Sequence, residues 1–203
     1  MIKNLIFDFG KVLVDYDISI IANKFFSEPE QMKLFQQLLS RPEAVAEMDR
    51  EEIPFSQYVA RLQAQYPAIA QSLQHFHDDY NMLITGEMPG MKDLLTRLKA
   101  KGYHLYGLTN WCSKVHNTIE KYSDLFGLLD GRIISSEVHF IKPEPEIYHA
   151  LLDTYRLVPE ECVFADDKPE NIAAAQALGI HGIVFVDACQ YARELSERFN
   201  IEL

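Results

Sequence analysis

The sequence predicts an α/β protein in which a doubly wound parallel sheet carries a small, all-helical insert. Two patterns predict this fold. From about residue 86 onward, amphipathic helical segments alternate with short apolar strands, and strands separated by helices pair in parallel. Residues 17–84 instead show helical spacing of apolar side chains and contain no convincing strand. We therefore expect a core domain of residues 1–16 and 85–203 and a helical domain of residues 17–84.

The elements of this fold are predicted in order along the chain. An apolar strand beginning at Leu5 delivers Asp8 to its end, and the chain then turns at Gly10. Asp17 caps a helix that continues to Phe26, and four prolines in the helical domain each suit the first turn of a further helix. The later elements are a helix to Lys101, a strand over 103–108, a helix over 113–125, a strand over 132–135, a helix over 145–155, a strand over 162–165, a helix over 169–178, a strand over 182–186 and a helix over 188–199.

The composition excludes several classes of partner. A net charge of -11 and the lack of a basic stripe argue against nucleic acid and acidic membranes as partners. No apolar run is long enough to span a bilayer, and no export signal is visible at the N-terminus. Cys112, Cys162 and Cys189 lack metal-ligand spacing and indicate free thiols in a reducing compartment. These features predict a cytoplasmic protein.

Polar residues follow four of the predicted strands, directly at the strand end in three cases and in the following loop in the case of Lys142. In a doubly wound sheet the ligand site lies outside the carboxyl ends of the strands, so these residues are expected to meet. The residues in question are Asp8, the pair Thr109 and Asn110, Lys142, and the pair Asp166 and Asp167.

Each of these residues also has a purely structural interpretation when it is considered alone. Asp8 and one member of the late acidic pair can cap a turn or a helix, and Thr109 with Asn110 can form a tight turn. Lys142 can be a solvated loop charge or the ion-pair partner of Glu144. Together, however, three neighbouring carboxylates need a compensating cation, and oxygen ligands of this kind suit Mg²⁺. The group therefore predicts a phosphoryl-transfer site with a carboxylate nucleophile, in which Lys142 and Thr109 hold the phosphoryl oxygens.

Four motifs with the expected strand contexts follow one another along nearly the whole chain. They are Asp8-Phe9-Gly10-Lys11-Val12-Leu13, Gly107-Leu108-Thr109-Asn110, Lys142-Pro143-Glu144-Pro145, and Phe164-Ala165-Asp166-Asp167-Lys168-Pro169-Glu170-Asn171. Any one of them is a weak signal, but the four in order are specific. In these motifs the chain resembles the haloacid dehalogenase superfamily of hydrolases, in the subfamily IA that carries a helical cap after the first strand.

This resemblance implies a Mg²⁺-dependent phosphatase that acts on a small phosphorylated metabolite through an aspartyl-phosphate, as a monomer or homodimer. It also implies roles for the residues at the strand ends. Asp8 is the nucleophile and a metal ligand, Asp167 is the principal second carboxylate ligand, Asp166 is a further ligand, Thr109 and Asn110 bind the phosphoryl group, and Lys142 stabilises the nucleophile and the phosphate.

Gly10 departs from the pattern of most phosphatases in this family. They carry a second aspartate at that position, which protonates the leaving group and then activates water, a contribution typically worth about 10² to 10⁴ in rate. Gly10 can still offer its carbonyl oxygen to Mg²⁺. The motif resembles a branch that includes bacterial sugar-phosphate phosphatases, such as α-D-glucose-1-phosphate phosphatase, and good leaving groups need less protonation. Asp15, Asp17 or a residue of the cap could replace the missing acid.

Three other functions compete with this interpretation. A haloacid dehalogenase needs no metal and carries a tyrosine at the position of Gly10, so the acidic pair and the glycine both argue against it. A catalytically weak phosphate-binding module would explain the glycine. A phospho-accepting receiver domain has its acidic pair after the first strand, not late in the chain.

The helical domain is expected to close over the site and to select the substrate. The polar candidates for contact with the substrate are Lys24, Arg41, Arg50, His75 and His77. Trp111, next to Asn110, either stacks on a sugar or packs in the core.

Overall fold

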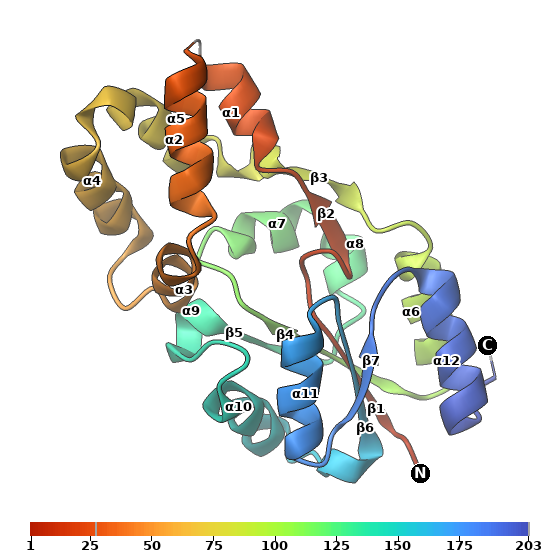
Figure 1. The fold of residues 1–203 in the computed structure, drawn as a ribbon. Helices are drawn as coiled ribbons and strands as arrows, with labels where there is room; N and C mark the ends of the chain where they lie inside the picture. Colours follow the sequence, from red (N-terminus) through yellow and green to blue (C-terminus); the bar gives the residue numbers. More distant parts are fainter. Residues whose placement is uncertain (27, 203) are drawn as a thin grey trace.

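A five-stranded parallel sheet forms the centre of the computed structural model, which describes residues 1–26 and 28–202 (Figure 1). All four strand pairs are parallel, so helices must connect them across the faces of the sheet. The strands, in their order across the sheet, are β5 (Gly131–Ile134), β4 (His104–Thr109), β1 (Asn4–Phe7), β6 (Cys162–Asp166) and β7 (His181–Val184). The predicted α/β class with a parallel sheet is confirmed.

Helices cover both faces of this sheet, and the alternation of side chains along β1 shows how. Leu5 and Phe7 belong to one buried cluster and Ile6 to another, because successive side chains of a strand point to opposite faces. The first face is covered by α6 (Met91–Ala100), α7 (Val115–Lys121), α8 (Ser123–Phe126) and α12 (Ala188–Phe199), and the second by α10 (Pro145–Tyr155) and α11 (Pro169–Ala177). β1 is buried on both faces, so its end is a rigid support for Asp8.

Five helices gather beyond the carboxyl ends of the strands and form a separate group in Figure 1. They are α1 (Ser19–Phe25), α2 (Pro29–Leu39), α3 (Pro42–Arg50), α4 (Phe55–Gln65) and α5 (Ala70–Asp78), with short 3₁₀ turns at Pro67–Ile69 and Tyr80–Leu83. Pro29 and Pro42 occupy the first turns of α2 and α3, where a missing N–H costs nothing. Aromatic rings fill the space between these helices; Phe35 and Phe76, for example, lie 5.7 Å apart.

A two-stranded antiparallel ribbon joins this helical group to the sheet, and the sequence did not reveal it. It consists of β2 (Val14–Tyr16) and β3 (Ile84–Glu87). Each strand is so short that no alternating pattern can develop. The predicted helix over 113–125 is also divided, because Tyr122 leaves the helical conformation between α7 and α8. A further short helix, α9 (Ser135–Val138), and a 3₁₀ turn at Pro159–Glu161 complete the core.

The three cysteines are free, as their spacing predicted. Cys112 and Cys162 are buried, and burial raises the pKa of their thiols to about 12 and about 11. Both thiols therefore stay protonated at neutral pH and serve as small core residues. Among the helices of residues 1–26 and 28–202, none combines the length and apolar character that a membrane crossing requires.

Candidate active site

Asp8 stands at the carboxyl end of β1, where its main chain and side chain are both fixed. Its N–H donates to the carbonyl of Ala165 (2.9 Å) and so extends the pairing of β1 with β6. Its Oδ1 accepts a hydrogen bond from the N–H of Phe9 (2.7 Å) and lies 2.9 Å from Nζ of Lys142. The next residues fold into a tight loop in which the Phe9 carbonyl accepts from the N–H groups of Leu13 and Val14. The carboxylate is thus nearly immobile before any substrate arrives.

Lys142 is the cation at the centre of the site. Only 3% of the residue is exposed, and its Nζ reaches Asp8, Asp166 (2.7 Å) and the carbonyl of Leu108 (2.9 Å). Asn110 clamps the main chain of the same residue: its Nδ2 donates to the Lys142 carbonyl (2.8 Å) and its Oδ1 accepts from the Lys142 N–H (2.7 Å). All three donors of the ammonium group are therefore used, and the position of Lys142 is set from both ends.

The acidic pair at the end of β6 is divided between a buried and a half-buried carboxylate. Asp166 is fully buried and accepts hydrogen bonds from Lys142, the N–H of Lys168 (2.8 Å) and the side-chain amide of Asn171 (3.0 Å to each oxygen). Asp167 lines the cavity described below. Asn171 was not predicted as a site residue. Its place at the end of the fourth motif, near the start of the helix after Pro169, was the available sequence signal for its role.

Charge and burial act against each other in this cluster. Burial raises the pKa of Asp8 to about 7, with Lys142 opposing the shift and Asp166 adding to it. Burial alone would lower the pKa of Lys142, but the negative charges of Asp8 and Asp166 have the larger, opposite effect. The pKa of Lys142 therefore lies above its usual value, and the lysine keeps its charge. Burial and the charge of Asp166 also raise the pKa of Asp167. One lysine does not fully compensate three carboxylates, so the site favours an added cation.

The donor set fits a divalent metal ion. One carboxylate oxygen from each of Asp8, Asp166 and Asp167 lies within 4.8 Å of the others. Hard cations such as Mg²⁺ prefer oxygen ligands of this kind. Gly10 lines the same cavity, on the loop that follows Asp8.

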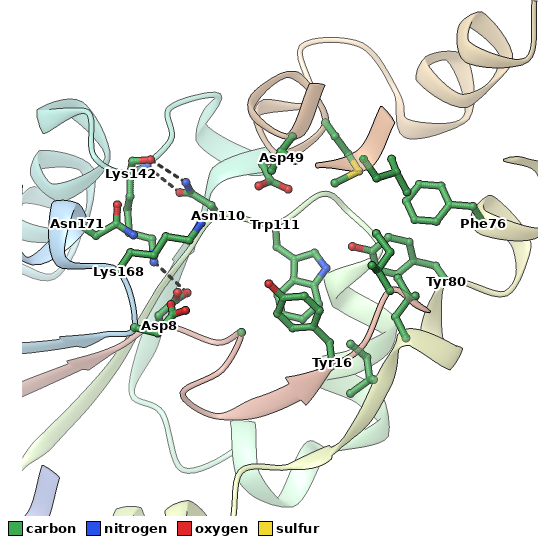
Figure 2. A pocket seen from close by; sticks show the side chains of 18 residues that line it. Asp8, Tyr16, Asp49, Phe76, Tyr80, Asn110, Trp111, Lys142, Lys168 and Asn171 are labelled. Carbon is green, nitrogen blue, oxygen red and sulfur yellow. Dashed lines mark hydrogen bonds and ion pairs between the residues drawn. The ribbon is translucent and has the colours of Figure 1, made fainter. Parts of the chain in front are cut away.

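A cavity of about 160 Å³ opens between these residues and the helical group (Figure 2). The core contributes a polar side, and the helical group contributes a largely apolar wall. The polar side consists of Asp8, Asn110, Lys142, Asp167, Lys168 and Asn171. That wall consists of Ile18, Leu39, Val45, Met48, Asp49, Phe76, Tyr80 and Leu83. The shape and the apolar lining are typical of a small-molecule site.

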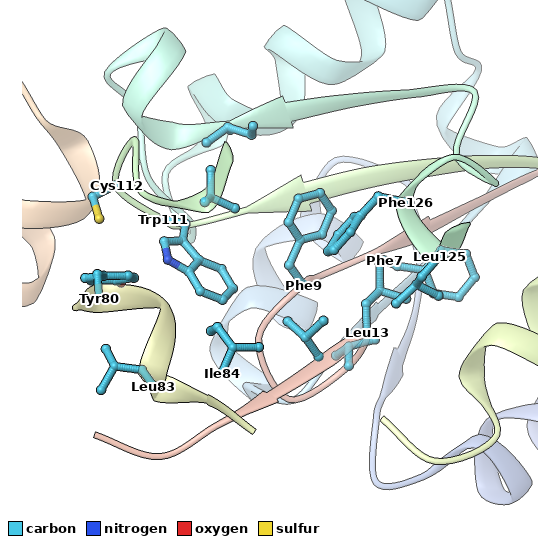
Figure 3. Close-up of a cluster of buried hydrophobic side chains, with 14 of the residues drawn as sticks. Phe7, Phe9, Leu13, Tyr80, Leu83, Ile84, Trp111, Cys112, Leu125 and Phe126 are labelled. Atoms are coloured by element: carbon cyan, nitrogen blue, oxygen red, sulfur yellow. The ribbon is translucent and has the colours of Figure 1, made fainter. Parts of the chain in front are cut away.

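Thr109 and Trp111 lie on either side of Asn110 and are placed differently from each other. Thr109 is 1% exposed, and its hydroxyl oxygen has no hydrogen-bond partner within residues 1–26 and 28–202. Trp111 lines the cavity and belongs to the same buried cluster as Phe9, Tyr80 and Ile84 (Figure 3). Its indole is therefore a packed wall residue, and one side of it remains available to a ligand.

The structure contradicts the predicted polar contacts from the helical domain. None of the five cationic candidates lines the cavity, because each of them lies elsewhere on the surface or is paired with another group. Arg50 forms an ion pair with Glu144. His75 contacts Asp79, and His77 contacts Asp78. Lys24 contacts Met82, and Arg41 lines a separate groove. Helical spacing alone does not show which face of an inserted helix meets the core.

The two predicted substitutes for the missing acid also lie outside the lining of the cavity. Asp15 pairs with Lys11, and Asp17 accepts a hydrogen bond from the N–H of Ser19 (2.8 Å) near the start of α1. Neither residue lines the cavity wall.

Asp49 is the polar residue of the helical group that sequence reasoning missed. It lies on α3 with Val45 and Met48, three and four residues apart, so all three share one face of the helix. Only 9% of Asp49 is exposed, and burial raises its pKa to about 7. An aspartate within the apolar stripe of a helix was the available signal, since such a residue is rarely buried without a role.

We expect Asp49→Asn to stabilise the protein, and more so at about pH 8 than at about pH 5. Between the ordinary pKa of 3.8 and the raised value of about 7, the folded state binds more protons than the unfolded state, so wild-type stability falls as pH rises. A neutral amide removes that dependence. Thermal melts across this pH range are expected to show a gain of about 2 kcal/mol, or roughly 4–8 °C, above pH 7. Asp15→Asn, at an exposed carboxylate, is the matched control and is expected to change the melting temperature little. A variant less stable than wild type at pH 8 would contradict this account.

Known proteins resemble this chain in sequence. The family model of haloacid dehalogenase-like hydrolases matches residues 2–179. Flavin mononucleotide hydrolase 1 of Arabidopsis thaliana is 31% identical over 110 residues, which are 54% of this chain and 44% of that protein. The chain thus spans less than half of that relative. D-ribitol-5-phosphate phosphatase of Bacteroides thetaiotaomicron is 25% identical over 219 residues, covering 98% of this chain and 100% of that protein.

A solved structure extends the likeness to the fold. The HAD family enzyme bt-2542 of Bacteroides thetaiotaomicron, in complex with magnesium and inorganic phosphate, has a TM-score of 0.71 at 22% identity and covers 93% of this chain and 96% of that chain. The four motifs, the parallel sheet that brings them together, and the match over residues 2–179 agree with one another. The chain belongs to the haloacid dehalogenase-like hydrolase family.

Proposed function

We propose that this protein is a Mg²⁺-dependent phosphatase that hydrolyses a small phosphorylated metabolite through an aspartyl-phosphate on Asp8. One observation carries the proposal: the Asp8 carboxylate is fixed beside the Lys142 ammonium and two further carboxylates, at the floor of a cavity of about 160 Å³. A carboxylate held in this way is arranged to attack an electrophile above it, and the surrounding charges suit a phosphoryl group.

In the proposed reaction, an oxygen of Asp8 attacks phosphorus as the bond from phosphorus to the leaving group breaks. Water then attacks the phosphorus of the aspartyl-phosphate, which releases inorganic phosphate and restores Asp8. Lys142 holds the nucleophile in place and offsets negative charge on the phosphoryl oxygens. The buried hydroxyl of Thr109 donates a hydrogen bond to one of them, and Asn110 keeps Lys142 in position.

Asp8, Asp167 and the carbonyl of Gly10 would hold the metal. When bound, Mg²⁺ neutralises and orients the phosphoryl oxygens. Asp167 is the better placed member of the pair, because Lys142, Lys168 and Asn171 already occupy the oxygens of Asp166. We assign Asp166 the supporting position behind the metal. The magnesium and phosphate in the complex of bt-2542 support this choice of ion.

We propose further that residues 17–84 act as a cap over a core of residues 1–16 and 85–203. Its apolar wall and Trp111 favour a leaving group with an apolar face, and a sugar or polyol phosphate can present one. The named activity of the ribitol-5-phosphate relative agrees with such a substrate. A location in the cytoplasm and a monomer or homodimer belong to the same proposal, with the free thiols in support of the location.

The test is phosphate release from a panel of sugar, polyol and aryl phosphates with Mg²⁺ and with a chelator. We expect turnover that the chelator abolishes and that excess Mg²⁺ restores, because the carboxylates repel the substrate when no cation is bound. Halide release from haloacids without metal would instead assign a dehalogenase. Binding of phosphate or Mg²⁺ without turnover on any substrate would assign a phosphate-binding module and end the phosphatase proposal.

A further inference from the structure

Most phosphatases of the family carry an acid/base aspartate at the position of Gly10, and in this protein another side chain occupies that space. A Cβ atom built on Gly10 would lie 3.0 Å from Cε1 of Tyr16, so the tyrosine ring fills the position of a side chain there. Partial desolvation of its phenol and the carboxylates of Asp167, Asp8 and Asp49 raise the pKa of Tyr16 to about 12, although the residue keeps 39% of its surface exposed. The phenol therefore keeps its proton at neutral pH. It can donate a hydrogen bond, but it cannot readily alternate between acid and base.

Asp49 lies across the cavity from Asp8, and its carboxylate is directed into the space between them (Figure 2). Within residues 1–26 and 28–202, no hydrogen bond or ion pair reaches this carboxylate, although the residue is only 9% exposed. The buried carboxylates of Asp8 and Asp166, in contrast, are each bound by Lys142 and by at least one N–H donor. Neither oxygen of Asp49 is among the fully buried atoms that lack a partner in the described residues, so the carboxylate faces the open space of the cavity. A ligand in the cavity can therefore reach these oxygens directly.

The turn that carries Asp49 is fastened to the core at three consecutive residues, which we call the docking turn (Asp49–Glu51). The Asp49 carbonyl accepts from Oγ of Ser135 (2.6 Å). The guanidinium of Arg50 donates to the Glu144 carboxylate and to the carbonyl of His139.

Glu51 completes the docking turn. Its carboxylate accepts hydrogen bonds from the N–H and the Oγ of Ser113. Its φ of 48° ends α3 in the left-handed region, directly after Arg50. Three segments of the core thus fix the cap residue Asp49 over the site.

We propose that Asp49 is the proton-transfer residue of the reaction, delivered by the cap in place of an aspartate at position 10. As Asp8 attacks phosphorus, protonated Asp49 gives its proton to the leaving-group oxygen, which departs as an alcohol. In the second half, ionised Asp49 takes a proton from the water whose oxygen attacks phosphorus, and the bond from phosphorus to Asp8 breaks. This inference rests on the phosphatase proposed above.

The surroundings of Asp49 suit this double role. Burial raises its pKa to about 7, Lys168 and Lys142 lower it, and Asp8 raises it. A carboxyl with such a pKa can both give and take a proton near neutral pH, which an ordinary aspartate does poorly. The other titratable groups that face it are Tyr16, Tyr58, Tyr80 and Cys112, all with pKa values raised by burial, and Glu51 beside Cys112.

The test compares wild type with Asp49→Asn on leaving groups that differ in their need for a proton. With Mg²⁺ present, kcat/KM, which reports the steps through phosphoryl transfer to Asp8, is expected to fall about 10²–10⁴-fold on an alkyl or sugar phosphate. On 4-nitrophenyl phosphate, whose leaving group needs no proton, the expected loss is less than about tenfold. Slow hydrolysis of the aspartyl-phosphate should then appear as a burst of nitrophenol equal to the enzyme present.

The pH profile gives a readout that a structural role would not change. Wild-type kcat/KM on the alkyl phosphate is expected to fall above about pH 7, where Asp49 loses its proton, and this limb is expected to be absent in Asp49→Asn. Asp15→Asn is the matched control, and its kinetics are expected to equal those of wild type.

Three outcomes would overturn the inference. One is an equal loss on both substrates with the basic limb retained, which would make Asp49 a wall residue. The second is wild-type kinetics in Asp49→Asn. The third is a kcat/KM that falls more on the alkyl phosphate than on 4-nitrophenyl phosphate in Tyr16→Phe but not in Asp49→Asn, which would make Tyr16 the proton donor. If the wild-type protein shows no metal-dependent turnover, the proposed function itself is refuted. A thermal melt of Asp49→Asn shows whether lost activity comes from misfolding or from lost proton transfer.

Discussion

Asp8→Asn is expected to lower kcat for phosphate release by a factor on the order of 10⁴ or more, to the limit of detection. The amide keeps the shape of the carboxylate but cannot act as the nucleophile, so no aspartyl-phosphate forms. The fold should persist, because Oδ1 of the amide can still accept from the N–H of Phe9 and from Lys142. The measurement is phosphate release with saturating Mg²⁺, together with the melting temperature.

The covalent intermediate gives an independent check on this prediction. Acid quenching of wild type during turnover is expected to leave one phosphoryl group on the peptide that contains Asp8, and none in the variant. Asp15→Asn, which removes a carboxylate seven residues further along the same segment, should retain both turnover and label. Turnover of Asp8→Asn within tenfold of wild type, or a label on another peptide, would refute the nucleophilic role of Asp8.

The sequence predicted the core of the fold well because its elements are long or strongly patterned. The helices over 145–155 and 188–199 have the bounds that were predicted. The parallel sheet could be predicted because its strands alternate with helices, and the sheet in turn predicted where the polar residues meet. The ribbon of β2 and β3 could not, because three or four residues give no periodicity and its pairing joins segments about 70 residues apart in the chain.

The residues of the candidate site also differ in whether the neighbouring sequence could predict them. Asp8 and the acidic pair follow from the strand that precedes each of them, and Lys142 follows from the proline-stiffened motif that carries it. Asp49 does not, since its place depends on which face of α3 meets the core. That choice is made by the docking turn, through contacts with residues more than 60 positions away in the chain. Periodicity shows that a helix has an inner face, but it does not show what that face meets.

Lys142→Met is expected to reduce both stability and activity, and Mg²⁺ should restore part of the stability. Removing the ammonium leaves Asp8 and Asp166 buried without a counter-charge, and breaking a buried ion pair from one side typically costs about 3–5 kcal/mol. For a chain of this size we expect the melting temperature to fall by roughly 6–20 °C without metal. Turnover should fall at least about 100-fold, since a cation at the phosphoryl group is lost.

The interplay with the metal distinguishes this explanation from a simple packing defect. If charge is the cause, Mg²⁺ should raise the melting temperature of Lys142→Met more than that of wild type, because the ion supplies the missing positive charge. Lowering the pH should also help the variant, since Asp8, whose pKa is already raised by burial, can then take up a proton. Lys168→Met removes an exposed lysine from the rim of the same cavity and is the matched control, with little change expected in stability. Equal responses of Lys142→Met and wild type to Mg²⁺ and to pH would show that the ammonium charge does not hold the site together.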